Sequence, residues 1–252
     1  AEIDHSPRKG RYISTSLNSA ELIKVTANAF LALKISFANS IAKLADKVDA
    51  DVVEVMDTVG ADERIGRAFL NAGRGYGGGC FPKDVSGLIA SGLQFGVDLD
   101  IMNAAQSLND SMPGYIIEKL QSALGDSLEG KRVAVLGLAF KAGTSDVRRS
   151  PGVALANILD EEKAIVTAYD PQAKEEATAD LRRGVQLRDS VNSAIQGVDA
   201  IIIATEWPEL IDHGVDKYVQ AMNGGVLVDA INCLSSVSID IGKAIYVGVG
   251  RH

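Results

Sequence analysis

The chain has 252 residues, of which 46% are hydrophobic and 23% charged, which is enough to bury an ordinary core in one or two domains. Its formal net charge of −8 argues against the basic face that a nucleic-acid-binding protein needs. Apolar runs such as residues 199–205 are too short to cross a bilayer, and no charged-then-apolar leader opens the chain. We therefore expect a cytoplasmic protein with neither a nucleic-acid nor a membrane partner.

Residues 1–18 mix prolines, glycines and polar residues without periodicity, so we interpret them as an extended lead-in. A long helix is predicted from Ser19, its expected N-cap, because large apolar residues follow at steps of three and four. The apolar stripe suggests a homodimer interface, although packing in the core explains it nearly as well. Its members are Leu22, Val25, Phe30, Leu33, Phe37, Ile41 and Leu44.

The rest of the first half also predicts helices, with a glycine-rich interruption. Helical spacing covers 51–59, 64–70, 84–92 and 100–124, the last broken or kinked near Pro113. Between the second and third of these lies the stretch Gly73–Gly79. The first half is therefore expected to be all-helical.

The second half alternates short buried strands with helices. Strands are predicted at 133–136, 165–169, 200–204, 226–228 and 244–247. Helices are predicted from Ser150-Pro151 and over 173–182, 189–196 and 214–222. This alternation is typical of a parallel, doubly wound α/β sheet of Rossmann type, whose ligands bind at the carboxyl ends of the strands. The predicted division is a lead-in (1–18), a helical domain (19–128) and a Rossmann-like domain (129–252).

The cysteines and histidines predict neither a disulfide framework nor a metal site. Cys80 and Cys233 stand in different contexts, and no CxxC or Cys/His ligand spacing occurs. His5, His213 and His252 are scattered, and two of them lie near the chain ends. We therefore predict no bound metal and no histidine-centred mechanism.

The string Gly73-Arg-Gly-Tyr-Gly-Gly-Gly-Cys-Phe-Pro-Lys-Asp84 is the most informative in the sequence. Its glycines let the backbone approach a ligand closely, and Cys80 follows them just before a predicted helix. A helix N-terminus and the ammonium of Lys83 both favour the thiolate, which is the nucleophilic form of cysteine. We interpret Cys80 as a catalytic thiol rather than an inert buried one.

Here the sequence resembles the UDP-glucose/GDP-mannose dehydrogenase family. The cysteine signature GYGGGCFPKD carries the resemblance, and AELIKVTANAF (20–30), RIGRAFLNAG (64–73), VLGLAFKAGTSDVR (135–148) and TEWPE (205–209) reinforce it. Tyr76 and the FPKD ending look most like the UDP-glucose branch. The resemblance implies a helical central dimerisation domain and an oxidoreductase of polysaccharide biosynthesis. The N-terminal domain that binds NAD in the family has no counterpart in this sequence, so we expect the isolated chain to be inactive.

The family reaction is a four-electron oxidation of a sugar C6 alcohol to a carboxylate by two NAD molecules in succession. By resemblance, Cys80 attacks the aldehyde to give a thiohemiacetal and then a thioester. Lys24 and Asn28, four residues apart on one helix face, are expected to stabilise the oxyanion. Asp84 is expected to position or deprotonate water. Taken alone, Lys24 and Asn28 would more often be ordinary surface contacts.

The resemblance also assigns residues to the ligands. Those expected to bind the UDP-sugar are Arg64, which reaches a neighbouring subunit's site in the family dimer, and Phe69, Asn71, Tyr76, Gly77, Phe81 and Lys141. Lys83 and Arg148 are expected to face NAD. Without the resemblance, Arg64, Lys141 and Arg148 would be surface or loop cations, and Phe69 a core residue.

Two alternatives stay open. The turn after the strand 133–136, together with Asp170, suggests a dinucleotide site, but Ala139 and Ala142 stand where a GxGxxG fingerprint needs glycines. Ile231 replaces an arginine that family members often carry and that grips the substrate, which weakens the assignment to UDP-glucose. The alternatives to a UDP-glucose enzyme are a dehydrogenase of another nucleotide sugar (GDP-mannose or a UDP-N-acetylhexosamine) and a non-catalytic binding or dimerisation module.

Overall fold

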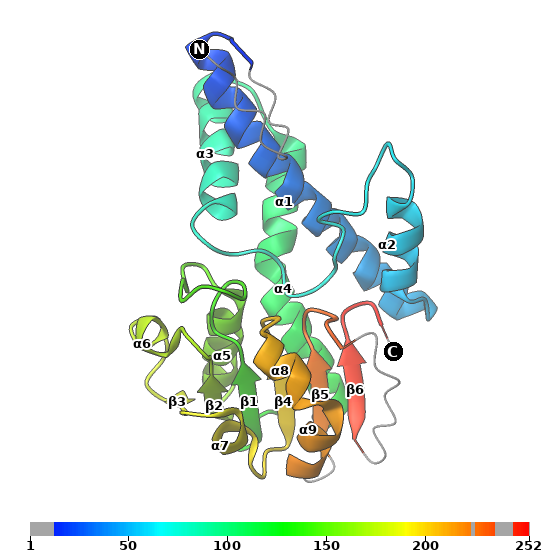
Figure 1. Cartoon of the computed structure of the whole chain (residues 1–252), viewed down its shortest axis with the longest axis vertical. Helices are drawn as coiled ribbons and strands as arrows, with labels where there is room; N and C mark the ends of the chain where they lie inside the picture. The colour runs from blue at the N-terminus through cyan, green and yellow to red at the C-terminus, as the bar shows by residue number, and fades with distance from the viewer. Residues whose placement is uncertain (1–12, 223–224, 235–243, 252) are drawn as a thin grey trace, which may run out of the picture.

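The computed structural model describes residues 13–222, 225–234 and 244–251. The first half is helical, as predicted, and forms an arm that stands on the second half (Figure 1). Its helices are α1 (Leu17–Val48), α2 (Val52–Gly60), α3 (Phe81–Gln94) and α4 (Asp100–Leu124). Of the predicted lead-in, residues 1–12 lie outside the described part, and residues 13–16 are neither helix nor strand.

Helix α1 begins earlier than predicted, because Ser16 and not Ser19 caps it. The Ser16 hydroxyl accepts a hydrogen bond from the Ser19 backbone N–H at 3.2 Å, in the extended conformation typical of an N-cap. Part of the predicted stripe lies away from the core: Phe30, Phe37 and Leu44 are exposed, whereas Ile41 packs against the core. The buried face consists of small residues, Ala29, Ala32, Ser36, Ala38, Asn39, Ala42 and Ala45.

The helix predicted over 64–70 is absent, and this prediction was wrong. Residues 61–70 form a series of turns, in which the Asp62 carboxylate accepts from the Arg64 backbone N–H. Gly66 and Phe69 both have positive φ, at 71° and 66°, which a helix does not allow. The periodic apolar residues therefore belong to a turn segment that leads into the glycine loop.

The second half is a six-stranded parallel sheet within the described residues, which confirms the predicted fold class. The strand order β3-β2-β1-β4-β5-β6 is that of a doubly wound Rossmann-type sheet. The strands are β1 (Arg132–Leu136), β2 (Ile165–Tyr169), β3 (Gln186–Leu187), β4 (Ala200–Ile203), β5 (Val226–Asp229) and β6 (Ile245–Gly248). The helices are α5 (Pro151–Glu161), α6 (Lys174–Ala177), α7 (Val191–Ile195), α8 (Pro208–His213) and α9 (Val215–Ala221). Strand β3 and helix α8 were not predicted, and α6 is shorter than the predicted 173–182.

Helix α4 joins the two halves. It packs against α1 and α3 in the arm and against α5, β5 and β6 in the sheet (Figure 1). It runs through Pro113 as one helix, and its buried Met112, Ile116 and Leu120 belong to the same apolar cluster as the sheet strands. The arm therefore holds the glycine loop against the carboxyl ends of the strands.

By length and composition alone, α1 is long and apolar enough to cross a membrane. A core helix of a water-soluble protein passes the same test, so the observation is weak. Here α1 packs along α3 and α4 and carries polar contacts: Lys24 and Asn28 bind Asp84, and Asn39 binds Gly73.

Candidate active site

The glycine loop is held by side-chain amides from two helices. Asn39 of α1 accepts from the Gly73 N–H at 2.7 Å. Asn109 of α4 accepts from the Tyr76 N–H at 2.7 Å and donates to the Tyr76 carbonyl at 3.2 Å. A Cβ at Gly77 would lie 2.3 Å from the carbonyl oxygen of Arg149, so only glycine allows the loop to approach the sheet domain this closely.

Cys80 lies at the end of this loop, as the N-cap residue of α3, and it is exposed. The helix begins at Phe81, three residues earlier than predicted, with Pro82 in its first turn. The Arg148 guanidinium lies against Gly79, where a Cβ would come within 2.7 Å of Arg148 Cζ. The thiol is thus accessible, at the positive end of a helix dipole and near a fixed cation.

Asp84 lies one turn after Cys80 in α3 and binds the other predicted catalytic residues, Lys24 and Asn28 of α1. Its Oδ2 accepts from Lys24 Nζ at 2.7 Å and from Asn28 Nδ2 at 2.6 Å, and its Oδ1 lies 3.2 Å from Lys83 Nζ. The hydrogen bond from Lys24 is the largest cause of a pKa for Asp84 of about 2, and the bonds from Asn28 and Lys83 add to it against the opposing effect of burial. The Asp84 N–H also donates to the Cys80 carbonyl at 2.9 Å, which joins the cluster to the thiol.

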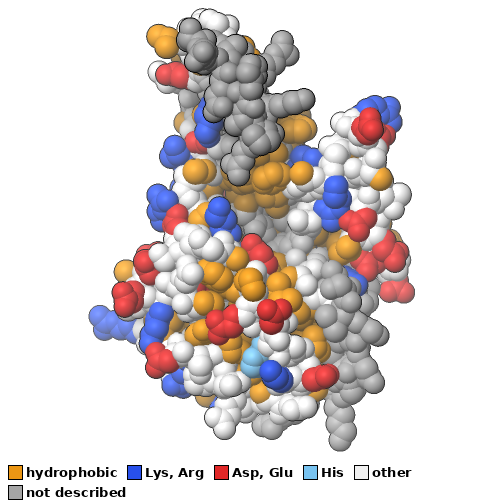
Figure 2. Space-filling model, viewed as in Figure 1, with side chains coloured by type: hydrophobic (Ala, Val, Ile, Leu, Met, Phe, Trp, Pro, Cys, Tyr) orange, Lys and Arg blue, Asp and Glu red, His pale blue; other side chains and the backbone are white. Residues whose placement is uncertain are grey.

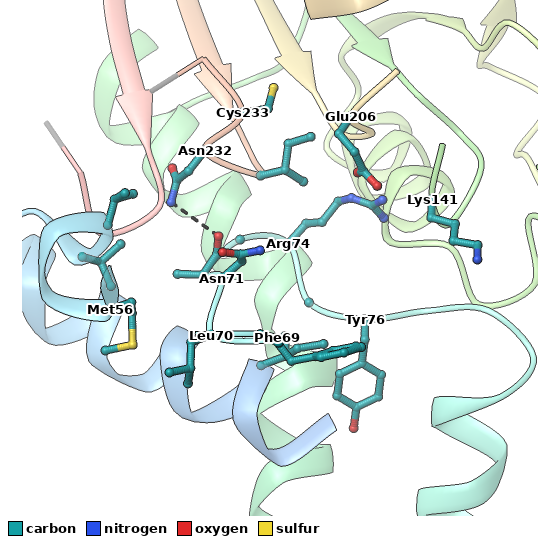
Figure 3. Close-up of a pocket in the computed structure, with 18 of the residues that line it drawn as sticks. Met56, Phe69, Leu70, Asn71, Arg74, Tyr76, Lys141, Glu206, Asn232 and Cys233 are labelled. Carbon is teal, nitrogen blue, oxygen red and sulfur yellow. Dashed lines mark hydrogen bonds between the residues drawn. The ribbon is translucent and has the colours of Figure 1, made fainter. Parts of the chain in front are cut away.

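A cavity of about 690 Å³ lies between the arm and the sheet and is lined by most of the predicted substrate residues. Figure 3 shows several of them around the cavity. The predicted residues that line it are Phe69, Asn71, Tyr76, Gly77, Phe81 and Lys141. Phe81 packs between Phe69 and Tyr76, with ring centroids 5.9 and 6.0 Å apart, so aromatic surface covers the arm side of the cavity.

Other predicted residues lie outside the cavity lining. Cys80 stands next to Phe81 at its edge, and Arg64 lies in an exposed turn, paired with Asp62 at 2.5 Å. Lys83 and Arg148 are exposed cations on the Cys80 side, paired with Asp84 and Asp146. The roles assigned to these residues stay predictions.

The cavity is also lined by residues at the ends of two strands. Ile231, which stands where family members often carry a substrate-binding arginine, follows β5. The sequence did not assign Glu206, which follows β4, or Asn232 and Cys233, which follow β5, to the site. The buried Asp229 carboxylate shapes the second loop by accepting from the Cys233 and Leu234 N–H groups at 3.1 and 2.7 Å. The rule that ligands bind at the carboxyl ends of parallel strands was the signal for these residues.

Comparison with known proteins places these features in a family. The profile described as "UDP-glucose/GDP-mannose dehydrogenase family, central domain" matches residues 18–111, and the family's "UDP binding domain" profile matches residues 134–236. The chain belongs to the UDP-glucose/GDP-mannose dehydrogenase family.

Individual relatives of this family agree in sequence and in structure. A UDP-glucose 6-dehydrogenase of Bacillus subtilis is 41% identical over 98% of this chain. A UDP-glucose dehydrogenase structure from Pyrobaculum islandicum has a TM-score of 0.82 and 40% identity over 93% of this chain and 51% of that one. A UDP-D-ManNAc dehydrogenase structure from Pyrococcus horikoshii has a TM-score of 0.81 and 30% identity over 96% of this chain and 54% of that one. The chain spans about half the length of these relatives, 53% for the B. subtilis protein.

Members of this dehydrogenase family use NAD, but the turn after β1 does not suit a dinucleotide. The N–H groups of Leu138 and Ala139, which would face a pyrophosphate, both donate to Asp170 Oδ2, at 2.7 and 2.9 Å. Trp207 Nε1 donates to the same oxygen at 3.0 Å. The protein's own carboxylate therefore takes the donors that a bound pyrophosphate would need.

No group of three or more metal-ligating side chains occurs within the described residues, among which His5 and His252 are not included. The absence of a metal site in the whole chain stays a prediction.

Proposed function

We propose that this chain is the catalytic and sugar-binding part of an NAD-dependent UDP-glucose 6-dehydrogenase. The observation that carries the proposal is an exposed thiol at the start of α3, one turn from the Lys24–Asn28–Asp84 cluster and at the edge of the large cavity. The 41% identity to a UDP-glucose 6-dehydrogenase of B. subtilis supports the choice of sugar.

Cys80 divides the second oxidation into steps. Its thiolate attacks the C6 aldehyde, a C–S bond forms, and the carbonyl π electrons move to oxygen to give the oxyanion of a thiohemiacetal. Departure of a hydride from C6, for which NAD would supply the acceptor, would restore the carbonyl as a thioester. Water then attacks this carbonyl and passes one proton to the solvent, the C–S bond breaks, and the thiolate leaves as the acid is released.

Lys24 and Asn28 supply the donors for the oxyanion in these steps. Both project from one face of α1 toward Asp84, so their N–H groups converge one turn from Cys80. Donors fixed before the reaction stabilise a developing negative charge without reorganisation at the moment of reaction. In the structure Asp84 holds both donors in place.

For Asp84 we propose the role of orienting Lys24, Asn28 and water rather than removing a proton. A general base is most effective when its pKa lies near the working pH. The pKa of Asp84 is about 2, because the carboxylate is already bonded to two ammonium groups and an amide. A carboxylate held this way accepts a proton poorly.

When bound, NAD would supply the two-electron acceptor for each oxidation of the sugar carbon. For this chain's part in its binding we propose Lys83 and Arg148. Their side chains are largely exposed and flank Cys80, and their charge suits a dinucleotide that approaches from the solvent side.

The enzyme is proposed to act as a homodimer through α1. Ile23, Phe30, Phe37 and Leu44 recur at seven-residue steps and are 54%, 58%, 49% and 58% exposed. Figure 2 shows apolar side chains gathered on the visible face of the arm. A second copy of the same helix fits this stripe, since a seven-residue repeat keeps one face toward a partner helix.

Thiol labelling in the presence of nucleotide sugar tests the proposal. We expect iodoacetamide to modify Cys80 faster than Cys233, whose thiol pKa is raised by burial and by Asp229. UDP-glucose at ten times its dissociation constant should slow the Cys80 reaction about tenfold and leave Cys233 unchanged. Mass spectrometry of each cysteine peptide measures both rates, and Cys80→Ser confirms the assignment.

Other outcomes separate the alternatives. Stronger protection by a UDP-N-acetylhexosamine than by UDP-glucose would favour another branch, which the P. horikoshii relative makes the second candidate. Binding of nucleotide sugar without protection of Cys80 would instead indicate a non-catalytic binding module.

A further inference from the structure

Arg74 is a buried cation in the wall of the cavity, and most of its hydrogen-bonding capacity is unused. Its side chain leaves the glycine loop, and the residue is only 4% exposed. One nitrogen, Nη2, donates to the Phe140 carbonyl at 2.9 Å and to Thr205 Oγ1 at 3.4 Å. Nε and Nη1 are buried and have no hydrogen-bond partner among the described residues.

Burial of a guanidinium without a full set of acceptors lowers the stability of the folded protein. Removing a guanidinium from water is compensated only by a close counter-charge and a full set of acceptors. Burial is the largest cause of a pKa for Arg74 of about 10, although Glu206 and Asp170 act in the opposite direction. No ion pair with either carboxylate forms within the described residues.

The position of Arg74 suits an anionic ligand. Phe140 follows β1 and Thr205 follows β4, so the guanidinium lies between the ends of the two strands where the strand order reverses. Ligands of doubly wound sheets bind in this crevice. Figure 3 shows the Arg74 side chain extending toward Glu206, with Lys141 beyond it.

The other cations that line the cavity do not provide a fixed positive charge for an anionic ligand. Arg67 is already bound to Asp57, to the Leu70 carbonyl and to Asn71. Lys141 is exposed, with Nζ 5.5 Å from the Phe140 ring centroid, so it is a mobile point charge. The loop after β5 contributes Ile231, Asn232 and Cys233 and no cation.

We propose that Arg74 binds the diphosphate of the nucleotide sugar, with Nε and Nη1 donating to phosphate oxygens. Guanidinium donors suit phosphate oxygens, and because Nε and Nη1 lie on different edges of the plane, they donate to different oxygens of the diphosphate. Glu206 and the Lys141 side chain, both exposed, move to admit the diphosphate. The inference rests on the proposed function and adds to it the residue that recognises the charged part of the substrate.

Binding of UDP-glucose, UDP and uridine to the 252-residue chain, measured by calorimetry, tests this inference. Arg74→Gln should weaken UDP-glucose and UDP binding by about 10- to 100-fold, the range for lost hydrogen bonds to a charged group, and leave uridine unchanged. Arg74→Lys should fall between, because it keeps the charge but loses the planar fork. Arg132→Gln, which removes an exposed charge at the amino end of β1, away from the cavity, is the matched control and should bind as the wild type does.

Thermal unfolding separates a ligand-binding role from a structural one. A cation that is buried to bind a ligand lowers the stability of the ligand-free protein. Arg74→Gln should therefore have a melting temperature equal to or above that of the wild type. Unchanged UDP binding by Arg74→Gln and Arg74→Lys would overturn the inference alone. Equal losses for UDP and uridine, with a lower melting temperature, would also overturn it. A wild-type chain that binds no UDP-sugar would instead overturn the proposed function and the inference with it.

Discussion

Asp84 shows how one buried carboxylate can organise a site through charge. It accepts from Lys24 and Asn28 and lies beside Lys83, and its own N–H binds the Cys80 carbonyl. Lys24 and Asn28 come from α1, about sixty positions earlier in the chain, so the cluster forms only when α1 and α3 pack together. Arg74 is the opposite case, since no carboxylate among the described residues pairs with its buried charge and two of its nitrogens have no hydrogen-bond partner there.

The low pKa of Asp84 gives a pH-dependent contribution to stability. The folded-state value of about 2 lies below the ordinary 3.8, so the contribution is present above about pH 4 and is lost as the pH falls toward 2. We expect Asp84→Asn to lower the free energy of unfolding by about 1–3 kcal/mol at pH 7. The difference from wild type should shrink steadily below pH 4. Denaturation at a series of pH values checks this, with the exposed Asp126→Asn as control; a pH-independent difference would contradict it.

At the scale of elements, α1 has two faces with different tasks. Small residues such as Ala32 and Ser36 lie against α3 and α4, and this lets the helices approach closely enough for Lys24 and Asn28 to reach Asp84. The large residues Phe30 and Phe37 lie on the exposed face. One helix therefore builds the active site and carries the surface assigned to the partner subunit.

Charge placed on the outer face of α1 should separate the dimer without unfolding the subunit. Phe30→Glu and Phe37→Glu put carboxylates into an apolar interface, where each is expected to cost several kcal/mol of association. Sedimentation equilibrium should then show a shift from dimer to monomer, with far-UV circular dichroism unchanged. Phe95→Glu, on the exposed residue that follows α3, is the matched control. A wild-type chain that is monomeric at micromolar concentration would disprove the dimer.

For the whole molecule, the two halves share one apolar core. The cluster runs from Ala38 of α1 through α4 to the strands and on to Val249. Polar contacts follow the same junction: Asp46 accepts from Tyr115 and Lys119 of α4 and from the Gly250 N–H. The division predicted at 128/129 stays a prediction, because the core of the described residues is continuous across it.

A shared core should unfold in one step. Trp207, the single tryptophan, is buried in the sheet half, whereas circular dichroism at 222 nm reports on the helices of both halves. We expect the two signals to give the same midpoint in urea. Asp46→Ala should move both together and lower stability by about 3–5 kcal/mol, because Lys119 then loses its buried partner. Separate midpoints would show that the arm and the sheet unfold independently.

The sequence by itself determined the features that local chemistry specifies. Glycines around Cys80 predicted the loop, and apolar runs such as 133–136 and 200–204 predicted the parallel sheet. The spacing of Lys24 and Asn28 predicted that they share one helix face. Each depends on backbone conformation or on residues a few positions apart. The family resemblance then supplied roles that spacing alone does not give.

The tertiary structure decided which surfaces meet. Periodicity could not show that α1 buries its alanines and exposes its phenylalanines, because a helix pattern does not say which neighbours approach. Periodicity also could not show that residues 64–70 form turns rather than a helix. Gly66 and Phe69 have positive φ there, and the segment leads into the glycine loop. The burial of Arg74 between β1 and β4 depends on contacts more than sixty residues away. Packing between residues far apart in the chain sets these features, and local sequence patterns do not show which distant residues meet.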